Sequence, residues 1–159
     1  MEESKMIIIL EGPDGSGKST LAEKLHQQTG YKLIHMDKPK TEEDKARMMD
    51  EYIQIIKTGK NVIFDRAWYS DMVYGPIMRN ETIITYPKMY ELECLLTAHG
   101  AIIIYCTAPT TTLWKRCLSR GEDYVTDVNT FKRICAEYDS LMHNIPHIVP
   151  VVTYEYNNM

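Results

Sequence analysis

The sequence predicts an α/β fold in which a parallel, five-stranded sheet carries helices on both faces. Short apolar runs alternate with segments of helical periodicity along the whole chain, which is typical of this class. The first run, residues 6–10, is apolar throughout, as expected for a strand covered on both faces. A length of 159 residues suits one domain, and no repeat or linker divides it, so we expect a single domain over 1–159.

Four further apolar runs are expected to form the remaining strands. They comprise residues 32–34, 61–64, 101–106 and 148–152. Pro150 lies in the last run, and a proline has no N–H group to donate to a neighbouring strand. That strand is therefore expected at an edge of the sheet or at a bulge.

The helices between these strands have recognisable ends. Thr41 and Asp44 form a start that resembles a capping box, and an apolar stripe follows them. Pro87 suits the first turn of another helix, and Gly100 suits its end. Asp127 is expected to cap the last helix.

The composition argues against several classes of protein. A formal net charge of −4 at pH 7 does not suit a protein that coats nucleic acid, so no stable nucleic-acid binding is expected. No apolar run approaches the ~20 residues of a membrane span, and the N-terminus lacks a signal-peptide pattern. The four cysteines include no C-x-x-C pair and are expected to be reduced thiols in the core, which indicates the cytoplasm. The five histidines show no ligand spacing, and surface or core positions are expected for them.

A phosphate-binding loop follows the first strand directly. Residues 12–19, Gly-Pro-Asp-Gly-Ser-Gly-Lys-Ser, fit the pattern G-x-x-x-x-G-K-[ST]. The glycines let successive backbone N–H groups face one anion, Lys18 reaches the terminal phosphates, and Ser19 offers a hydroxyl to Mg²⁺. The helix that begins near Lys18 adds the positive end of its dipole. The sequence therefore predicts binding of ATP and Mg²⁺ by the loop residues Gly12, Asp14, Gly15, Ser16, Gly17, Lys18, Ser19 and Thr20.

Asp14 is an unusual residue for a loop that binds a polyanion, because its own charge is negative. Two interpretations stay open at this point. The carboxylate points away from ATP, toward a sugar hydroxyl of the second substrate, or it stiffens the turn through a local Asx-type hydrogen bond.

A charged pair, Asp65-Arg66, follows the third predicted strand, at the sheet edge where α/β proteins bind their ligands. Asp65 is expected to hold water molecules of the Mg²⁺ shell, and Arg66 is expected to bind a phosphate of the acceptor. The alternative is a structural ion pair between a strand and a helix.

Arg116 and Arg120 lie four residues apart, so on a helix they share one face. Gly121 and a polar segment follow, which favours a short lid over about 116–127. Arginines that close over a transferring phosphoryl group stabilise its charge. The alternative is a solvated helix face.

Three segments resemble the thymidylate kinase family of P-loop nucleoside monophosphate kinases. They are residues 11–20 with the phosphate loop, residues 65–75 with Asp-Arg followed by Ser70 and Tyr74, and residues 107–141 with the two arginines and the final helix. The resemblance implies the P-loop kinase fold, the use of ATP and Mg²⁺, and a homodimer.

The resemblance also implies roles for single residues. The catalytic residues would be Lys18, Arg66, Arg116 and Arg120. The acceptor would be bound by Asp14, which contacts the sugar, and by Arg66, Ser70 and Tyr74. The metal site would comprise Ser19 and Asp65.

The chain departs from this family in three places. Ala67 stands where the family has an aromatic residue, and Gly75 stands where it has a glutamine near the base. The Glu-Pro-Gly-Gly segment after the second strand is absent, and the chain is short, as in a compact variant. The base and sugar of the acceptor are therefore not fixed by the sequence.

The expected function is ATP-dependent phosphorylation of a (deoxy)nucleoside monophosphate, such as dTMP or a related pyrimidine, in nucleotide biosynthesis. A second hypothesis is a deoxynucleoside kinase, because residues 68–71 resemble a Tyr-Ser-Asp segment of that family and Asp65 would then serve as the base. A monophosphate needs no base, since its second pKa near 6 leaves it mostly ionised. The phosphate loop of deoxynucleoside kinases also lacks an aspartate at the position of Asp14, and both points favour the monophosphate. A third hypothesis is a non-catalytic nucleotide-binding module.

Overall fold

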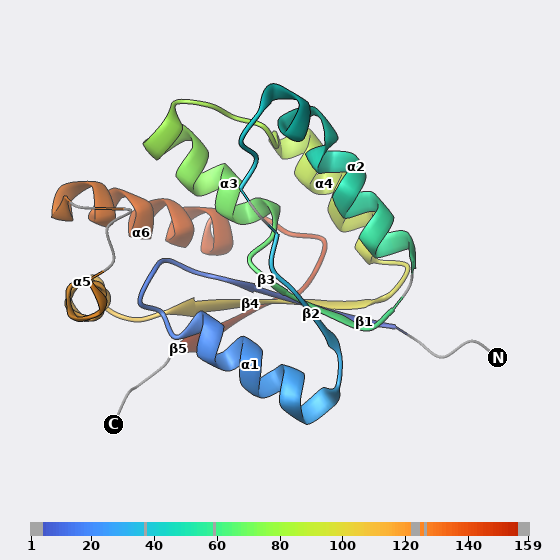
Figure 1. Ribbon diagram of the computed structural model, residues 1–159, viewed down its shortest axis with the longest axis horizontal. Helices are drawn as coiled ribbons and strands as arrows, with labels where there is room; N and C mark the ends of the chain where they lie inside the picture. Colours follow the sequence, from blue (N-terminus) through green and yellow to red (C-terminus); the bar gives the residue numbers. More distant parts are fainter. Residues whose placement is uncertain (1–4, 37, 59, 122–124, 126, 156–159) are drawn as a thin grey trace.

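The computed structural model describes residues 5–36, 38–58, 60–121, 125 and 127–155. A five-stranded parallel sheet forms its centre, with the strand order β2-β3-β1-β4-β5 (Figure 1). Helix α1 covers one face of this sheet, while α2, α4 and α6 lie on the other (Figure 1). The α/β fold predicted from the alternation of strands and helices is therefore confirmed.

The strands are β1 (Met6–Glu11), β2 (Lys32–Ile34), β3 (Val62–Asp65), β4 (Gly100–Thr107) and β5 (Val151–Glu155). The central strand, β1, pairs in parallel with both β3 and β4. Its side chains alternate between two layers of core, because Ile7 and Ile9 pack toward the large helical layer and Ile8 and Leu10 pack toward α1. A strand buried on both faces needs apolar residues at every position, which explains the continuous run in the sequence.

The last strand begins later than predicted. The run over 148–152 indicated a strand, but β5 starts at Val151. Ile148 bonds away from the sheet, since its N–H donates to Glu93 Oε1 over 2.7 Å. The first bond to the neighbouring strand β4 comes at Pro150, whose carbonyl accepts from the N–H of Ile103. The strand lies at an edge of the sheet, as Pro150 indicated.

The helices are α1 (Lys18–Thr29), α2 (Glu42–Thr58), α3 (Trp68–Tyr74), the π-helix η1 (Gly75–Arg79), α4 (Tyr86–Leu96), α5 (Thr110–Arg120) and α6 (Val128–His143). The predicted capping box forms, since Asp44 N donates to Thr41 Oγ1 over 3.0 Å and Thr41 N donates to Asp44 Oδ2 over 3.2 Å. Asp127 caps α6 by accepting from two N–H groups of its first turn. Gly100 does not end α4, which stops at Leu96, but begins β4.

Three cysteines are buried free thiols, as predicted, namely Cys106, Cys117 and Cys135. The prediction is wrong for Cys94, which is exposed because it lies on the solvent side of α4. Among the described residues, no helix has the length and apolar character needed to cross a membrane.

Candidate active site

The phosphate loop connects β1 to α1 at the carboxyl edge of the sheet. Gly12 has a φ of 154°, and a Cβ atom there would lie 2.1 Å from the carbonyl oxygen of Cys106 on β4. Gly15 has a φ of 82°, and its Cβ atom would lie 2.8 Å from the carbonyl oxygen of Leu113 on α5. Both positions thus require glycine, because neighbouring backbone fills the space that a side chain would occupy.

Lys18 and Ser19 begin α1 and face Asp65, the last residue of β3. The Lys18 ammonium forms a buried, short ion pair with Asp65 Oδ1, and Ser19 Oγ donates to Asp65 Oδ2 over 3.2 Å. Burial by itself would raise the pKa of Asp65, but the charge and hydrogen bond of Lys18, with smaller contributions from His35 and Ser19, together hold that pKa below its ordinary value. An ionised carboxylate beside a hydroxyl provides two of the oxygen ligands that Mg²⁺ prefers.

Arg66 is the meeting point of the residues predicted to bind the acceptor. Its Nη2 donates to Asp14 Oδ1 over 2.8 Å, and its Nη1 donates to Ser70 Oγ over 3.1 Å and to the hydroxyl of Tyr138 over 2.8 Å. The guanidinium carbon also lies 5.3 Å from the centre of the Tyr74 ring, within the range of a cation–π contact. The partner of Asp14 is thus Arg66, which neither interpretation of the sequence foresaw.

Two residues at this point were not singled out by the sequence. Glu11, at the end of β1, is buried and accepts from the backbone and side chain of Ser70 and from the hydroxyl of Tyr138. Tyr138 was expected only as a core residue in the apolar stripe of α6. A carboxylate that ends an otherwise apolar strand was the available signal for Glu11.

A cavity of about 220 Å³ lies over the phosphate loop. Its cationic side chains are Lys18, Arg66 and Arg120, and its other lining residues are Pro13, Asp14, Gly15, Ser16, Gly17, Ser19 and His35. The buried hydroxyl of Ser16 has no hydrogen-bond partner within the described part of the chain, which leaves a donor for a phosphate oxygen. The volume is below the roughly 300–1,000 Å³ of cavities that hold whole ligands, so this one suits phosphate groups. The residues present therefore fit the phosphates of a nucleotide.

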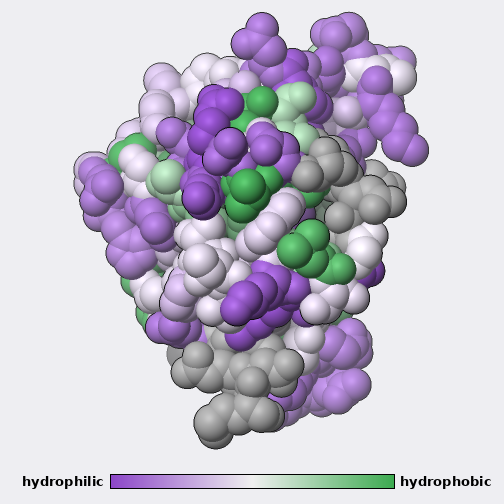
Figure 2. All heavy atoms as spheres, turned by 90° about the vertical axis from the view of Figure 1, so that its left-hand side faces the viewer, coloured by the Kyte–Doolittle hydropathy of each residue, from purple (hydrophilic) through white to green (hydrophobic). Residues whose placement is uncertain are grey.

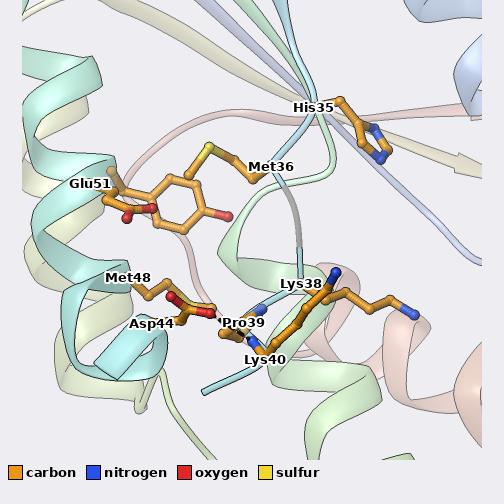
Figure 3. A pocket seen from close by; sticks show the side chains of 9 residues that line it. His35, Met36, Lys38, Pro39, Lys40, Asp44, Met48 and Glu51 are labelled. Atoms are coloured by element: carbon orange, nitrogen blue, oxygen red, sulfur yellow. Dashed lines mark hydrogen bonds between the residues drawn. The ribbon is translucent and has the colours of Figure 1, made fainter. Parts of the chain in front are cut away.

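A second cavity, of about 420 Å³, lies between α2 and the segment that joins β2 to α2. Its lining comprises His35, Met36, Lys38, Pro39, Lys40, Asp44, Met48, Glu51 and Tyr52. Figure 3 shows Asp44, Met48 and Glu51 on the helix, with Lys38 and Lys40 across from them on the connecting segment. The size of this cavity falls in the range of nucleoside-sized ligands.

His35 lines both cavities, and its Nδ1 lies 3.6 Å from Asp65 Oδ2. The sequence had left this histidine as a surface or core residue. Its position directly after β2 was the signal for a ligand-facing side chain, because ligands of open α/β sheets bind at the carboxyl ends of the strands. This edge lies at the left of Figure 1, and on the same face in Figure 2 hydrophilic side chains lie above and below a middle of pale and apolar ones.

The two arginines of the predicted lid lie on α5. Arg116 Nη1 donates to the carbonyl oxygen of Gly15 over 3.0 Å, so it contacts the backbone of the phosphate loop. Arg120 lines the phosphate cavity at the end of the same helix. The predicted lid over about 116–127 includes residues 122–124 and 126, which lie outside the described residues. Thr20 lies in the first turn of α1 and is exposed.

Comparisons with known proteins identify a kinase family and related bacterial proteins. Residues 1–128 match the family Polyphosphate kinase 2 (PPK2). The uncharacterized SPbeta prophage-derived protein YorR of Bacillus subtilis is 31% identical over 119 residues, which cover 75% of this chain and 72% of that protein. The deoxyguanosine kinase of Bacillus subtilis is 23% identical over 171 residues, which cover 92% of this chain and 83% of that protein.

Solved structures give the same fold. The crystal structure of YorR in complex with phosphorylated GDP matches with a TM-score of 0.79 and 27% identity, over 94% of this chain and 85% of that chain. Deoxyadenosine kinase from M. mycoides, with the products dCMP and dCDP, matches with a TM-score of 0.66 over 94% of this chain and 90% of that chain. Its identity of 16% makes this second likeness one of fold alone. The sheet and its helices are thus those of the P-loop kinases.

Proposed function

The chain belongs to the polyphosphate kinase 2 family, and from this premise we propose that it transfers a phosphoryl group from Mg-ATP to a (deoxy)nucleoside monophosphate. The observation that carries the proposal is the phosphate cavity, where Lys18, Arg66 and Arg120 converge beside an ionised Asp65. Such a cluster of cations suits two anionic substrates that must approach each other. The resemblance to thymidylate kinases makes dTMP the first acceptor to test.

The donor is assigned to the phosphate loop. Its backbone N–H groups and the ammonium of Lys18 hold the terminal phosphates, and the hydroxyl of Ser16 supplies a further donor. Ser19 and Asp65 would hold Mg²⁺, which neutralises part of the phosphate charge when it is bound. These two side chains already lie within hydrogen-bond distance of each other, so one ion can reach both.

The acceptor is assigned to Arg66. Its Nη2 faces the phosphate cavity, where it exchanges Asp14 for a phosphate oxygen of the acceptor. Asp14 is then available to a sugar hydroxyl. An oxygen of the acceptor phosphate attacks the γ-phosphorus in line, the bond from that phosphorus to the β–γ bridging oxygen breaks, and ADP leaves. Arg116 and Arg120 stabilise the charge that spreads over the transferring group.

The electrostatics of Asp65 favour a monophosphate over a nucleoside. A nucleoside hydroxyl must lose a proton to a base, and a carboxylate paired with Lys18 at a lowered pKa is a weak one. A monophosphate is mostly ionised at neutral pH and needs no such step. A deoxynucleoside kinase is the second candidate, because the Bacillus subtilis relative that covers 92% of this chain is a deoxyguanosine kinase.

The test is an acceptor panel with the purified protein. Mg-ATP and, separately, inorganic polyphosphate are supplied as donors, with each common nucleoside monophosphate and nucleoside as acceptor, and products are separated by chromatography. Turnover of a monophosphate with ATP supports the proposal, and loss of turnover in Lys18→Ala is the matched control. If only nucleosides are turned over, the role of Asp65 changes to that of the catalytic base. If polyphosphate is the only donor that supports turnover, it takes the place of ATP in the proposal. Tight ATP binding without turnover of any acceptor supports the binding module instead, and sedimentation of the same sample tests the homodimer.

A further inference from the structure

We propose that Glu11 is a positioning residue whose buried carboxylate directs the guanidinium of Arg66 into the phosphate cavity. The inference rests on the proposed function, in which Arg66 binds the acceptor phosphate. Glu11 itself does not line that cavity, so it acts through other groups. Its contacts reach Arg66 along two routes, one through the backbone and one through side-chain hydroxyls.

The backbone route fixes the peptide beside Arg66. Glu11 Oε1 accepts from the N–H of Ala67 over 2.7 Å and from the N–H of Ser70 over 3.2 Å. These N–H groups belong to the start of α3, whose N-cap residue is Ala67 and has no side chain able to cap. Glu11, at the end of β1, thus caps the N-terminus of α3, although α3 itself follows β3. It thereby holds Arg66 at a φ of 71°, a left-handed conformation that non-glycine residues seldom adopt.

The side-chain route orients two hydroxyl groups. Glu11 Oε2 accepts from Ser70 Oγ over 2.7 Å and from the hydroxyl of Tyr138 over 3.2 Å. Burial raises the pKa of Glu11, and the Arg66 charge beside it works against that shift. In its ionised form the carboxylate only accepts hydrogen bonds, so it draws both hydroxyl protons toward itself. The oxygen lone pairs that remain face Nη1 of Arg66, which donates to both hydroxyls. With Nη1 held in this way, Nη2 is the nitrogen directed at Asp14 and the cavity.

The substitution Glu11→Gln separates positioning from mere support of the fold. It keeps the shape of the side chain but places an NH₂ donor where one carboxylate oxygen accepted, so the hydroxyls lose their fixed orientation. We expect the KM for the acceptor to rise about tenfold, as for loss of a hydrogen bond to a charged group, while the KM for ATP changes by less than about twofold. In an Arg66→Ala background, Glu11→Gln should have no further effect on the acceptor KM.

Tyr138→Phe is a second variant that leaves the cap of α3 in place. It removes one of the hydroxyls that accept from Arg66, and we expect a rise in the acceptor KM in the same direction as for Glu11→Gln. Tyr105→Phe is its matched control, because the Tyr105 ring stacks on Tyr138 at 6.1 Å while its hydroxyl donates to Asp139 instead. This control should leave the acceptor KM unchanged, so the Tyr138 pair tests the side-chain route to Arg66 even if Glu11→Gln fails to fold.

The outcomes separate the inference from the proposed function on which it rests. Calorimetry with dTMP in the presence of Mg-ADP gives the acceptor affinity of every variant without requiring turnover. If Arg66→Ala leaves this affinity unchanged, the assignment of Arg66 to the acceptor is wrong. If Arg66→Ala weakens it but Glu11→Gln and Tyr138→Phe do not, Glu11 only supports the fold and our inference is overturned. An equal loss from Glu11→Gln with and without Arg66 would overturn it as well.

Discussion

Glu93 and His147 form an ion pair in the core, and breaking this pair tests how the C-terminal strand is held. Glu93 Oε2 accepts from His147 Nδ1 and from the hydroxyl of Tyr69, both over 2.8 Å, and Oε1 accepts from the N–H of Ile148 over 2.7 Å. The other ring nitrogen of His147 lies 2.7 Å from the carbonyl oxygen of Leu141. Both ring nitrogens face oxygen acceptors, so the ring carries two protons and a positive charge.

The perturbation is Glu93→Gln, which removes the negative charge and replaces one acceptor oxygen by an NH₂ group. In either orientation of the amide, that group faces a donor: the N–H of Ile148 in one, and Tyr69 and His147 in the other. Loss of one partner from a buried ion pair costs about 3–5 kcal/mol. At about 2–4 °C per kcal/mol for a domain of this size, the Tm should fall by roughly 6–20 °C.

The effect depends on pH in a direction set by the two pKa shifts. Burial opposes the charged ring of His147, but its hydrogen bonds to Glu93 and to the Leu141 carbonyl, with the charge of Glu93, together outweigh burial and raise the pKa. The contribution of His147 is therefore complete below its unfolded pKa of about 6.5 and is lost as the pH rises through the folded value. Burial likewise opposes ionised Glu93, but the hydrogen bonds from His147, Tyr69 and the Ile148 N–H together lower its pKa. The contribution of Glu93 is therefore complete above about 4.3 and is lost at lower pH. The difference in Tm should be largest between about pH 4.3 and 6.5.

The assay is thermal unfolding followed by circular dichroism from pH 5 to pH 9. The matched control is Glu91→Gln, an exposed position on the same helix, which should shift the Tm by no more than about 2 °C. This account of the pair would be refuted if the Tm of Glu93→Gln equalled that of the control. It would also be refuted if the difference in Tm between Glu93→Gln and the native protein grew steadily above pH 7.

Three further predictions concern the phosphate loop and the last helix. Gly15→Ala places a Cβ atom 2.8 Å from the carbonyl oxygen of Leu113 at a φ of 82°. The strain of about 1–2 kcal/mol should weaken ATP binding, measured by calorimetry, by about five- to thirtyfold. Unchanged affinity would show that the loop relaxes freely. Ser19→Ala should raise the Mg²⁺ concentration needed for half-maximal activity. If the Mg²⁺ titration of this variant overlays the native curve, the assignment of Ser19 to the metal site is wrong. Asp127→Ala deletes the cap of α6 and should lower the free energy of unfolding in urea by about 1 kcal/mol, whereas no change would mean that the cap is replaced.

Features set by neighbouring residues could be predicted from the sequence. The caps at Thr41 and Asp127 follow from side chains that bond to N–H groups two or three residues away, so the local sequence contains all the information required. The same holds for the phosphate loop over 12–19, whose glycines and lysine are fixed by spacing alone. The strands β1 to β4 were located because their runs are apolar enough to be recognised without knowledge of their partners.

Features set by distant partners could not be predicted. The start of β5 depends on β4, because Val151 pairs with Ile103 and the carbonyl of Pro150 accepts from the same residue. The apolar run alone gives no reason to begin the strand at Val151 rather than at Ile148. Asp14 is a similar case, since its partner Arg66 is 52 positions away and has a left-handed backbone conformation that the local sequence does not indicate.

Tyr138 shows why the roles of site residues are harder to predict than their burial. The helical stripe of α6 correctly placed this residue in the core, and its ring is fully buried there. Periodicity identifies the face of a helix that is covered, but it does not indicate which groups meet the polar atom at the end of a buried side chain. A buried hydroxyl must be paired, and here its partners come from the ends of two neighbouring strands, Glu11 after β1 and Arg66 after β3. Hence Tyr138, which the sequence pattern indicates only as a core residue, also helps to hold Arg66, the side chain assigned to the acceptor phosphate.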